Sequence, residues 1–160
     1  EKACTVVVTQ HVFGAGLEGR VIEIGFGTGL NVPHYPDAVQ SVAGVEPSPR
    51  SVKIARGRLA ASRVPVEIVG LDGQRLDQPD ASFDHALCTW TLCTIPDPRA
   101  ALFEISRVLK DGGVLHFVEH GLAPGELVLA MRVAPSGAMA SVRAAALDSG
   151  FQRTSTRPGT

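Results

Sequence analysis

Cysteine is scarce in this sequence, and the few cysteines form no recognisable pair. Only three are present, Cys4, Cys88 and Cys93, and no two of them make a CxxC motif. An odd number without such a pair argues against a disulfide framework and against a zinc knuckle. Neither a set of carboxylates nor a soft cluster suited to a cation is apparent either. We therefore expect a reducing, cytoplasmic environment and no bound metal.

Long apolar runs and strong net charge are also missing. No apolar run reaches the roughly 18 to 20 residues that cross a bilayer, and the first residues lack the basic start and apolar core of a signal peptide. The 15 basic and 16 acidic residues form no long run of one sign and leave a net charge of −1. Because this balance gives no attraction to a nucleic-acid backbone, we expect neither a nucleic-acid partner nor a membrane span. The oligomeric state stays open.

Short β-branched runs alternate with helical patterns from residue 20 onward, which is typical of βαβ units in a mostly parallel sheet. At 160 residues with 44% hydrophobic content, the chain fits one domain, 1–160. Near-continuous apolar runs predict five strands buried on both faces, at 21–24, 42–46, 64–70, 83–88 and 114–119. We expect an α/β domain with a doubly wound sheet.

Two helix starts are marked by a capping residue followed by proline. Ser48 precedes Pro49, and Asp97 precedes Pro98. The second of these helices is predicted to run over 98–110 and to end at the glycine pair 112–113.

The two ends of the sequence are less regular. Residues 4–13 favour a strand locally, although a short helix ahead of the first strand is also compatible, and both alternatives stay open. After His120, only 141–149 predicts a helix, and 151–157 fits a sixth strand.

Three glycines, Gly25, Gly27 and Gly29, alternate with other residues directly after the first predicted strand. A glycine turn that leads into a helix exposes backbone N–H groups and lets a cofactor approach closely. The nicotinamide fingerprint has its third glycine one position later, where this sequence has Leu30. The following segment, 31–36, contains two prolines and predicts a broken helix, too short to present a long dipole to a diphosphate. The loop therefore favours a nucleoside cofactor without phosphates.

An acidic residue follows each of the next two strands. Glu46, at the end of the second strand, could accept hydrogen bonds from both hydroxyls of a ribose, although nicotinamide-binding domains place an acid similarly. Asp72, after the third strand, could accept one from an adenine amino group, or could simply be a turn residue before Gly73. Three strand ends thus converge on one nucleoside.

These residues together resemble the class I S-adenosylmethionine-dependent methyltransferases, and the likeness extends from Arg20 to about Gly125. In that family the glycine motif, the acids after strands two and three, and the segment after strand four line the cofactor pocket. The segments that are similar to the type 11 group are 80–84, 87–93, 104–113 and 117–120. Leu30–Pro36 (LNVPHYP) and Leu92–Pro98 (LCTIPDP) are similar to the methyltransferase-like 7 proteins, which act on thiols, and to their bacterial relatives.

The resemblance implies a Rossmann-like α/β domain that binds S-adenosylmethionine and releases S-adenosylhomocysteine. The cofactor-binding residues that we assign are Glu23, Gly25, Phe26, Gly27, Gly29, Glu46, Pro47, Ser48, Asp72, Gly73, Thr89, Trp90 and Thr91. The candidate residues on the acceptor side are Trp90, Cys93, His34 and Tyr35. His120, at the end of the fifth strand, is the candidate to take a proton from the acceptor, and a structural hydrogen bond is the alternative for it.

The expected activity is methyl transfer to a small, fairly apolar acceptor such as a thiol, an amine or a lipid-like molecule. The segment Cys88–Thr91 differs from the Asn/Asp-Pro-Pro-aromatic run of methyltransferases that modify nucleobase or amide nitrogens, which disfavours such acceptors. Family members usually end in two antiparallel strands, whereas this sequence leaves room for one at most, so we expect those strands to be shortened or missing. The alternatives are a nonenzymatic nucleoside-binding domain and a nicotinamide-dependent dehydrogenase.

Overall fold

The computed structural model describes residues 16–120, 126–133 and 139–144. In chain order its elements are β1 (Gly19–Ile24), η1 (Val32–His34), β2 (Val39–Val45), α2 (Pro49–Ala60), β3 (Val66–Gly70), β4 (Phe83–Thr89), η2 (Leu92–Thr94), α3 (Pro98–Val108), β5 (Leu109–His120), β6 (Glu126–Val133) and β7 (Met139–Ala144). Each of the five strands predicted from an apolar run is present, with shifted ends.

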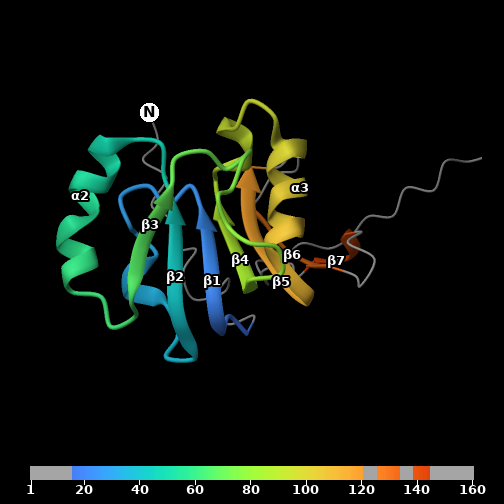
Figure 1. Ribbon diagram of the computed structural model, residues 1–160, viewed down its shortest axis with the longest axis horizontal. Helices are drawn as coiled ribbons and strands as arrows, with labels where there is room; N and C mark the ends of the chain where they lie inside the picture. The colour runs from blue at the N-terminus through green and yellow to red at the C-terminus, as the bar shows by residue number, and fades with distance from the viewer. Residues whose placement is uncertain (1–15, 121–125, 134–138, 145–160) are drawn as a thin grey trace, which may run out of the picture.

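The strands form one sheet in the spatial order β3-β2-β1-β4-β5-β6-β7. β1 pairs in parallel with β2 on one side and with β4 on the other, so the chain order reverses beside β1. The parallel strands point toward the same edge of the sheet (Figure 1). Ligands of open α/β sheets bind at the carboxyl ends of strands at such a reversal. The prediction of a mostly parallel, doubly wound sheet is confirmed.

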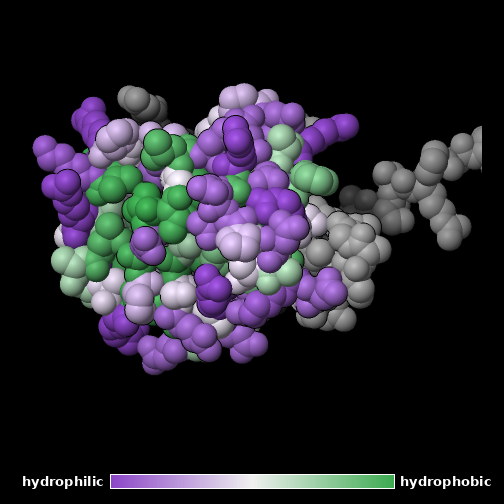
Figure 2. Space-filling view, in the orientation of Figure 1, coloured by the Kyte–Doolittle hydropathy of each residue, from purple (hydrophilic) through white to green (hydrophobic). Residues whose placement is uncertain are grey.

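Two apolar layers cover opposite faces of the sheet. Ala55 of α2 belongs to the same buried cluster as Val21, whereas Ile105 of α3 belongs to the cluster that contains Ile22. Because successive strand residues point to opposite faces, α2 and α3 pack on opposite sides. On the face shown in Figure 2, polar residues cover α3, and apolar residues gather beside it over β2 and β3.

Both predicted helix caps are present. The Ser48 Oγ accepts a hydrogen bond from the Ser51 N–H at 3.2 Å at the start of α2. The Asp97 Oδ1 accepts from the backbone N–H groups of Arg99 and Ala100, at 3.0 and 3.1 Å, at the start of α3. These bonds satisfy N–H groups that have no partner inside a helix.

The end of α3 differs from the prediction. The helix stops at Val108, two residues before Lys110, because Leu109 already pairs with Phe83 in the β4–β5 ladder. Leu109 is buried, so tertiary packing rather than the glycine pair ends the helix. Gly112, with a φ of +76°, lies inside β5 instead of capping α3.

The last described strands correct two further predictions. β6 pairs antiparallel with β5, and β7 pairs antiparallel with β6, so two strands follow β5 where the sequence left room for one at most. The helix predicted over 141–149 is wrong at 141–144, which lie in β7, because pairing with β6 overrides the helical pattern there. The segments 4–13 and 151–157, and the remainder of 141–149, lie outside the described residues.

Candidate functional site

The three glycines after β1 all have positive φ angles, of 74° at Gly25, 58° at Gly27 and 73° at Gly29. A Cβ atom at Gly25 would lie 2.0 Å from the Thr91 Oγ1, so the Thr91 side chain would have to shift. A Cβ atom at Gly27 would have the Gly25 carbonyl oxygen as its nearest neighbour, at 3.8 Å, so that side of the loop faces open space. Gly25 is thus required by packing, and Gly27 leaves room for a ligand.

Glu46 fastens this loop to the end of β2. Its side chain is buried, and its Oε2 accepts a hydrogen bond from the Gly27 N–H at 2.7 Å. Its Oε1 accepts one from the Ser48 N–H at 2.9 Å, at the start of α2. Each carboxylate oxygen can accept more than one hydrogen bond. Glu46 can therefore hold the loop and still accept from the hydroxyls of a ribose.

A cavity of about 930 Å³ opens at the carboxyl ends of β1, β2, β3 and β4. Its volume suits a small-molecule ligand, for which pockets of about 300–1,000 Å³ are usual. The residues that line it are Ile24–Thr28, Leu30, Asn31, His34, Val45–Pro47, Leu71–Gln74, Thr89–Thr91 and Thr94–Pro96.

Most of the residues assigned from the sequence meet at this cavity. Those among its lining are Gly25, Phe26, Gly27, His34, Glu46, Pro47, Asp72, Gly73, Thr89, Trp90 and Thr91. Their contacts with a ligand remain predictions. The proposed nucleoside would thus have the loop after β1 beneath it and an acid at the end of β2 and of β3.

Five assigned residues do not line the cavity. Glu23 and Tyr35 lie buried beneath the loop, and Cys93 is exposed on η2. Gly29 packs close to Phe26, and Ser48 serves as the cap of α2. Glu23 does not reach the cavity because the glycine loop covers the end of β1, and it stabilises that loop from below.

For His120 the structure describes the backbone position alone. It is the last residue of β5, two residues beyond Val118, which pairs with Thr89 at the end of β4. His120 therefore lies at the same edge of the sheet as the cavity. Its role toward a proton stays a prediction.

A buried polar network supports the loop from below. The Glu23 carboxylate accepts hydrogen bonds from the Tyr35 hydroxyl and, at 2.8 Å, from the Asn31 Nδ2. The Asn31 Nδ2 also donates to the Thr89 Oγ1 at 3.2 Å. Burial raises the pKa of Glu23 to about 7, although the bonds from Tyr35 and Asn31 act to lower it. Burial, followed by the nearby Glu23 carboxylate, raises the pKa of Tyr35.

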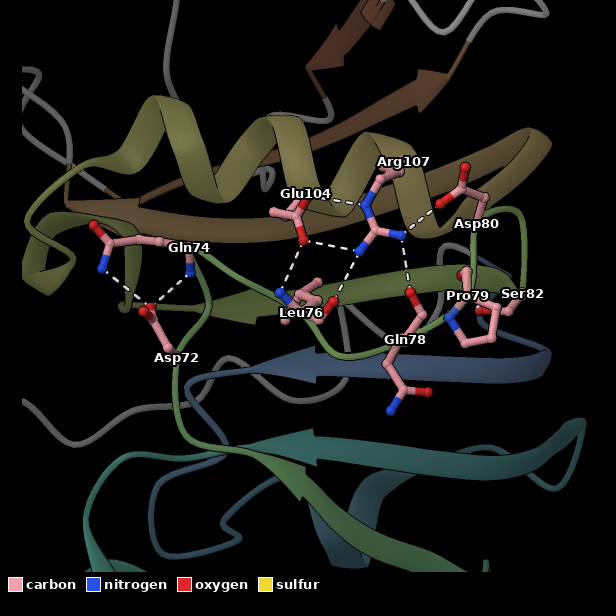
Figure 3. A network of polar contacts seen from close by, with 9 residues as sticks. All are labelled: Asp72, Gln74, Leu76, Gln78, Pro79, Asp80, Ser82, Glu104 and Arg107. Carbon is pink, nitrogen blue, oxygen red and sulfur yellow. Dashed lines mark hydrogen bonds and ion pairs between the residues drawn. The ribbon is translucent and has the colours of Figure 1, made fainter.

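Asp72 is held in place by its neighbour Gln74. The Asp72 Oδ1 accepts from the backbone N–H and the side-chain Nε2 of Gln74, at 2.8 and 3.0 Å (Figure 3). These bonds hold the pKa of Asp72 below its ordinary value. The Gln74 Oε1 accepts from the Asp97 N–H at 3.0 Å, which links this carboxylate to the start of α3.

The segment between β3 and β4 is fastened to α3 by Arg107 and Glu104. Arg107 donates to the carbonyl oxygens of Leu76 and Gln78, at 2.8 and 2.9 Å. The Glu104 carboxylate accepts from the Leu76 N–H at 2.8 Å and from the Arg107 guanidinium. Figure 3 shows Arg107 at the centre of this network, which extends to Asp80. The network therefore supports the segment that carries Asp72.

Trp90 adopts a backbone conformation that only glycine adopts readily. Its φ is 49°, directly after β4, and it lines the cavity while packing against the core on the α2 side. Backbone strain of this kind costs about 1–3 kcal/mol and clusters at functional sites. Thr91 follows, and its hydroxyl donates to the Thr89 carbonyl oxygen at 3.0 Å.

Several lining residues were missed from the sequence. Asn31 gave no signal because it reads as part of a broken helix, and Gln74 because it follows a plain turn. Leu30 and Leu71 are apolar and exposed at the cavity, which only the structure reveals. Within the described ranges, no helix is long and apolar enough to cross a membrane. No group of three or more His, Cys, Asp or Glu there is arranged to hold a metal ion.

Comparison with known proteins identifies the family. Residues 22–117 match the model of a methyltransferase domain. A thiol S-methyltransferase of Rattus norvegicus is 37% identical over 114 residues, which cover 69% of this chain and 46% of that protein. A phosphatidylethanolamine N-methyltransferase of Cereibacter sphaeroides is 35% identical, with coverages of 69% and 54%.

A solved structure agrees with these relatives. The S-adenosylmethionine-dependent methyltransferase of Thermotoga maritima has a TM-score of 0.56 and 40% identity, and the match covers 69% of this chain and 48% of that one. The chain spans about half the length of the curated relatives that it matches. A family match that begins in β1 and ends in β5, together with the glycine loop and this sheet order, makes the chain a member of the class I S-adenosylmethionine-dependent methyltransferase family.

Proposed function

We propose that this chain transfers a methyl group from S-adenosylmethionine to a small, fairly apolar acceptor. S-Adenosylmethionine is the methyl donor of the family, so the hypothesis of a nicotinamide-dependent dehydrogenase is dropped. The observation that carries the proposal is the cavity itself, where the glycine loop and the Glu46 and Asp72 carboxylates meet. The residues present fit a nucleoside, because open space at Gly27 and hydrogen-bond acceptors beyond it suit an adenosyl group.

The acceptor class is proposed from the apolar part of the cavity and from the relatives' names. Leu30, Leu71 and Trp90 line the cavity, and Ile95 and Pro96 join them from the segment after η2. Such a lining favours an apolar acceptor over a charged one. Relatives named for thiols and for phosphatidylethanolamine support a thiol, an amine or a lipid-like molecule.

The chemical demands on the protein are modest. Bound S-adenosylmethionine supplies a methyl group that its sulfonium already activates, so no protein nucleophile is needed. The cavity has to align the acceptor lone pair with the sulfur–methyl bond and to exclude water, and such alignment can supply about 7–11 kcal/mol. A thiol or amine acceptor also gives up a proton, which we propose that His120 accepts.

A product assay tests this proposal. The chain is incubated with S-adenosylmethionine and an alkyl thiol, a primary amine or phosphatidylethanolamine vesicles, and methylated product and S-adenosylhomocysteine are followed by mass spectrometry. We expect product with at least one of these acceptors, in amounts equal to the S-adenosylhomocysteine formed. Binding of S-adenosylhomocysteine without product from any acceptor would instead support a nonenzymatic nucleoside-binding domain.

A further inference from the structure

The side chain of Asn31 is built into the site in an unusual way. It is about nine-tenths buried, it lines the cavity, and it stands at the start of η1 without capping that helix. Helix capping therefore does not explain an asparagine at this position. Its contacts inside the site do.

The hydrogen bonds of Asn31 fix the orientation of its amide. The amide nitrogen of Asn31 faces Glu23, and this Nδ2 donates both to the Glu23 Oε1 at 2.8 Å and to the Thr89 Oγ1 at 3.2 Å. Both hydrogens of the Nδ2 are thereby engaged. Within the described part of the chain, the Oδ1 makes no hydrogen bond, and it is the one polar atom of this side chain left to meet a ligand.

The sheet order indicates which part of the ligand lies nearby. Glu46 and Asp72 follow β2 and β3, on one side of β1, whereas Thr89 ends β4 on the other side. A nucleoside bound over β2 and β3 would direct the rest of its molecule across the glycine loop toward β4. There the amino-acid end of S-adenosylmethionine would meet Asn31. Its ammonium group requires hydrogen-bond acceptors once it leaves water.

We propose that the Asn31 Oδ1 binds the ammonium group of the cofactor's amino-acid end, with Glu23 and Thr89 as positioning residues that hold the amide. This proposal rests on the proposed function, because it assumes that the cavity binds S-adenosylmethionine. Glu23 acts from beneath the loop through Asn31 without lining the cavity itself, and a nearby ammonium would favour the ionised form of its carboxyl group. The asparagine thus couples a buried carboxylate to the ligand.

Three ligands separate this role from a structural one. S-Adenosylhomocysteine carries both the ammonium and the carboxylate, S-adenosyl-3-thiopropylamine keeps only the ammonium, and 5′-methylthioadenosine lacks both. Their dissociation constants are measured by calorimetric titration of the full chain, of Asn31→Ala and of Asn31→Gln, which keeps an amide but displaces its oxygen. Gly57→Ala is the control, because Gly57 lies in α2 outside the cavity lining and nothing is within 4 Å of the added Cβ.

Loss of a hydrogen bond to a charged group weakens binding by roughly ten- to a hundredfold. We expect a loss of that size for Asn31→Ala with the two ligands that carry the ammonium, and about the same affinity as the unchanged chain for 5′-methylthioadenosine. Asn31→Gln should show the same selectivity with a smaller loss, and Gly57→Ala should bind all three ligands as the unchanged chain does. Binding of 5′-methylthioadenosine also shows that each variant is folded.

Two results would overturn this inference alone. Equal losses for all three ligands would make Asn31 a structural residue, and a loss confined to S-adenosylhomocysteine would place the amide against the carboxylate of the ligand. Failure of the unchanged chain to bind S-adenosylhomocysteine would instead overturn the proposed function and this inference together.

Discussion

Gly25 and Gly27 make different demands on the same loop, and alanine at each position separates packing from ligand space. Both residues have positive φ, and the left-handed backbone costs a non-glycine residue about 1–2 kcal/mol. Gly27→Ala should lose only that much stability, because its Cβ would meet nothing closer than 3.8 Å. Gly25→Ala adds a contact of 2.0 Å with the Thr91 Oγ1, and overpacking of this kind costs about 1–3 kcal/mol more.

Binding should show the opposite order. A Cβ at Gly27 occupies the open space over the loop. Gly27→Ala should therefore weaken the binding of S-adenosylhomocysteine at least about tenfold, although it lowers stability only modestly. Gly57→Ala in α2 is the control: nothing lies within 4 Å of its Cβ, and alanine in a helix should stabilise the chain by about 0.5–1 kcal/mol without affecting binding.

The assays are urea unfolding, for the free energy of unfolding, and calorimetric titration with S-adenosylhomocysteine. If Gly25→Ala were no less stable than Gly27→Ala, packing against Thr91 would not be the reason for glycine at position 25. If Gly27→Ala bound the ligand with unchanged affinity, the loop would not face the cofactor.

Three further predictions address other parts of the site and core. Glu46→Ala should weaken S-adenosylhomocysteine by roughly ten- to a hundredfold in the same titration, and unchanged affinity would show that the ribose lies elsewhere. Gln74→Ala should weaken the binding of S-adenosylhomocysteine more than the binding of its inosine analogue, which lacks the adenine amino group. Equal losses of affinity for the two ligands would show that Gln74 does not position Asp72 toward the adenine. Burial lowers the pKa of His116 to about 4 from 6.5, so the unfolded chain binds that proton more readily, and stability present above about pH 6.5 is lost as the pH falls toward 4. The free energy of unfolding should drop by about 2 kcal/mol between pH 7 and pH 5 through this group, and much of that drop should disappear in His116→Leu; an equal drop in both proteins would contradict it.

The parallel core of the fold was predictable because its signals are local. Each buried strand is an apolar run, and Ser48 and Asp97 cap their helices with bonds that the sequence already suggests. The end of α3 and the strand β7 were not predictable, because pairing with β4 and β6 overrides the local pattern. Tertiary pairing of this kind leaves no signal in a short window of sequence.

The candidate site divides in the same way. Gly27, Glu46 and Asp72 could be found because spacing after a strand fixes where they lie. Asn31 and Gln74 could not, because their importance comes from hydrogen bonds to residues distant in the chain, Thr89 and Asp97.

Calorimetric titration of the unmodified chain decides whether this cavity binds the family's methyl donor. S-Adenosylhomocysteine is the ligand and NADH the control. We expect saturable one-to-one binding of S-adenosylhomocysteine and none of NADH. Absence of binding, or equal binding of NADH, would contradict this expectation.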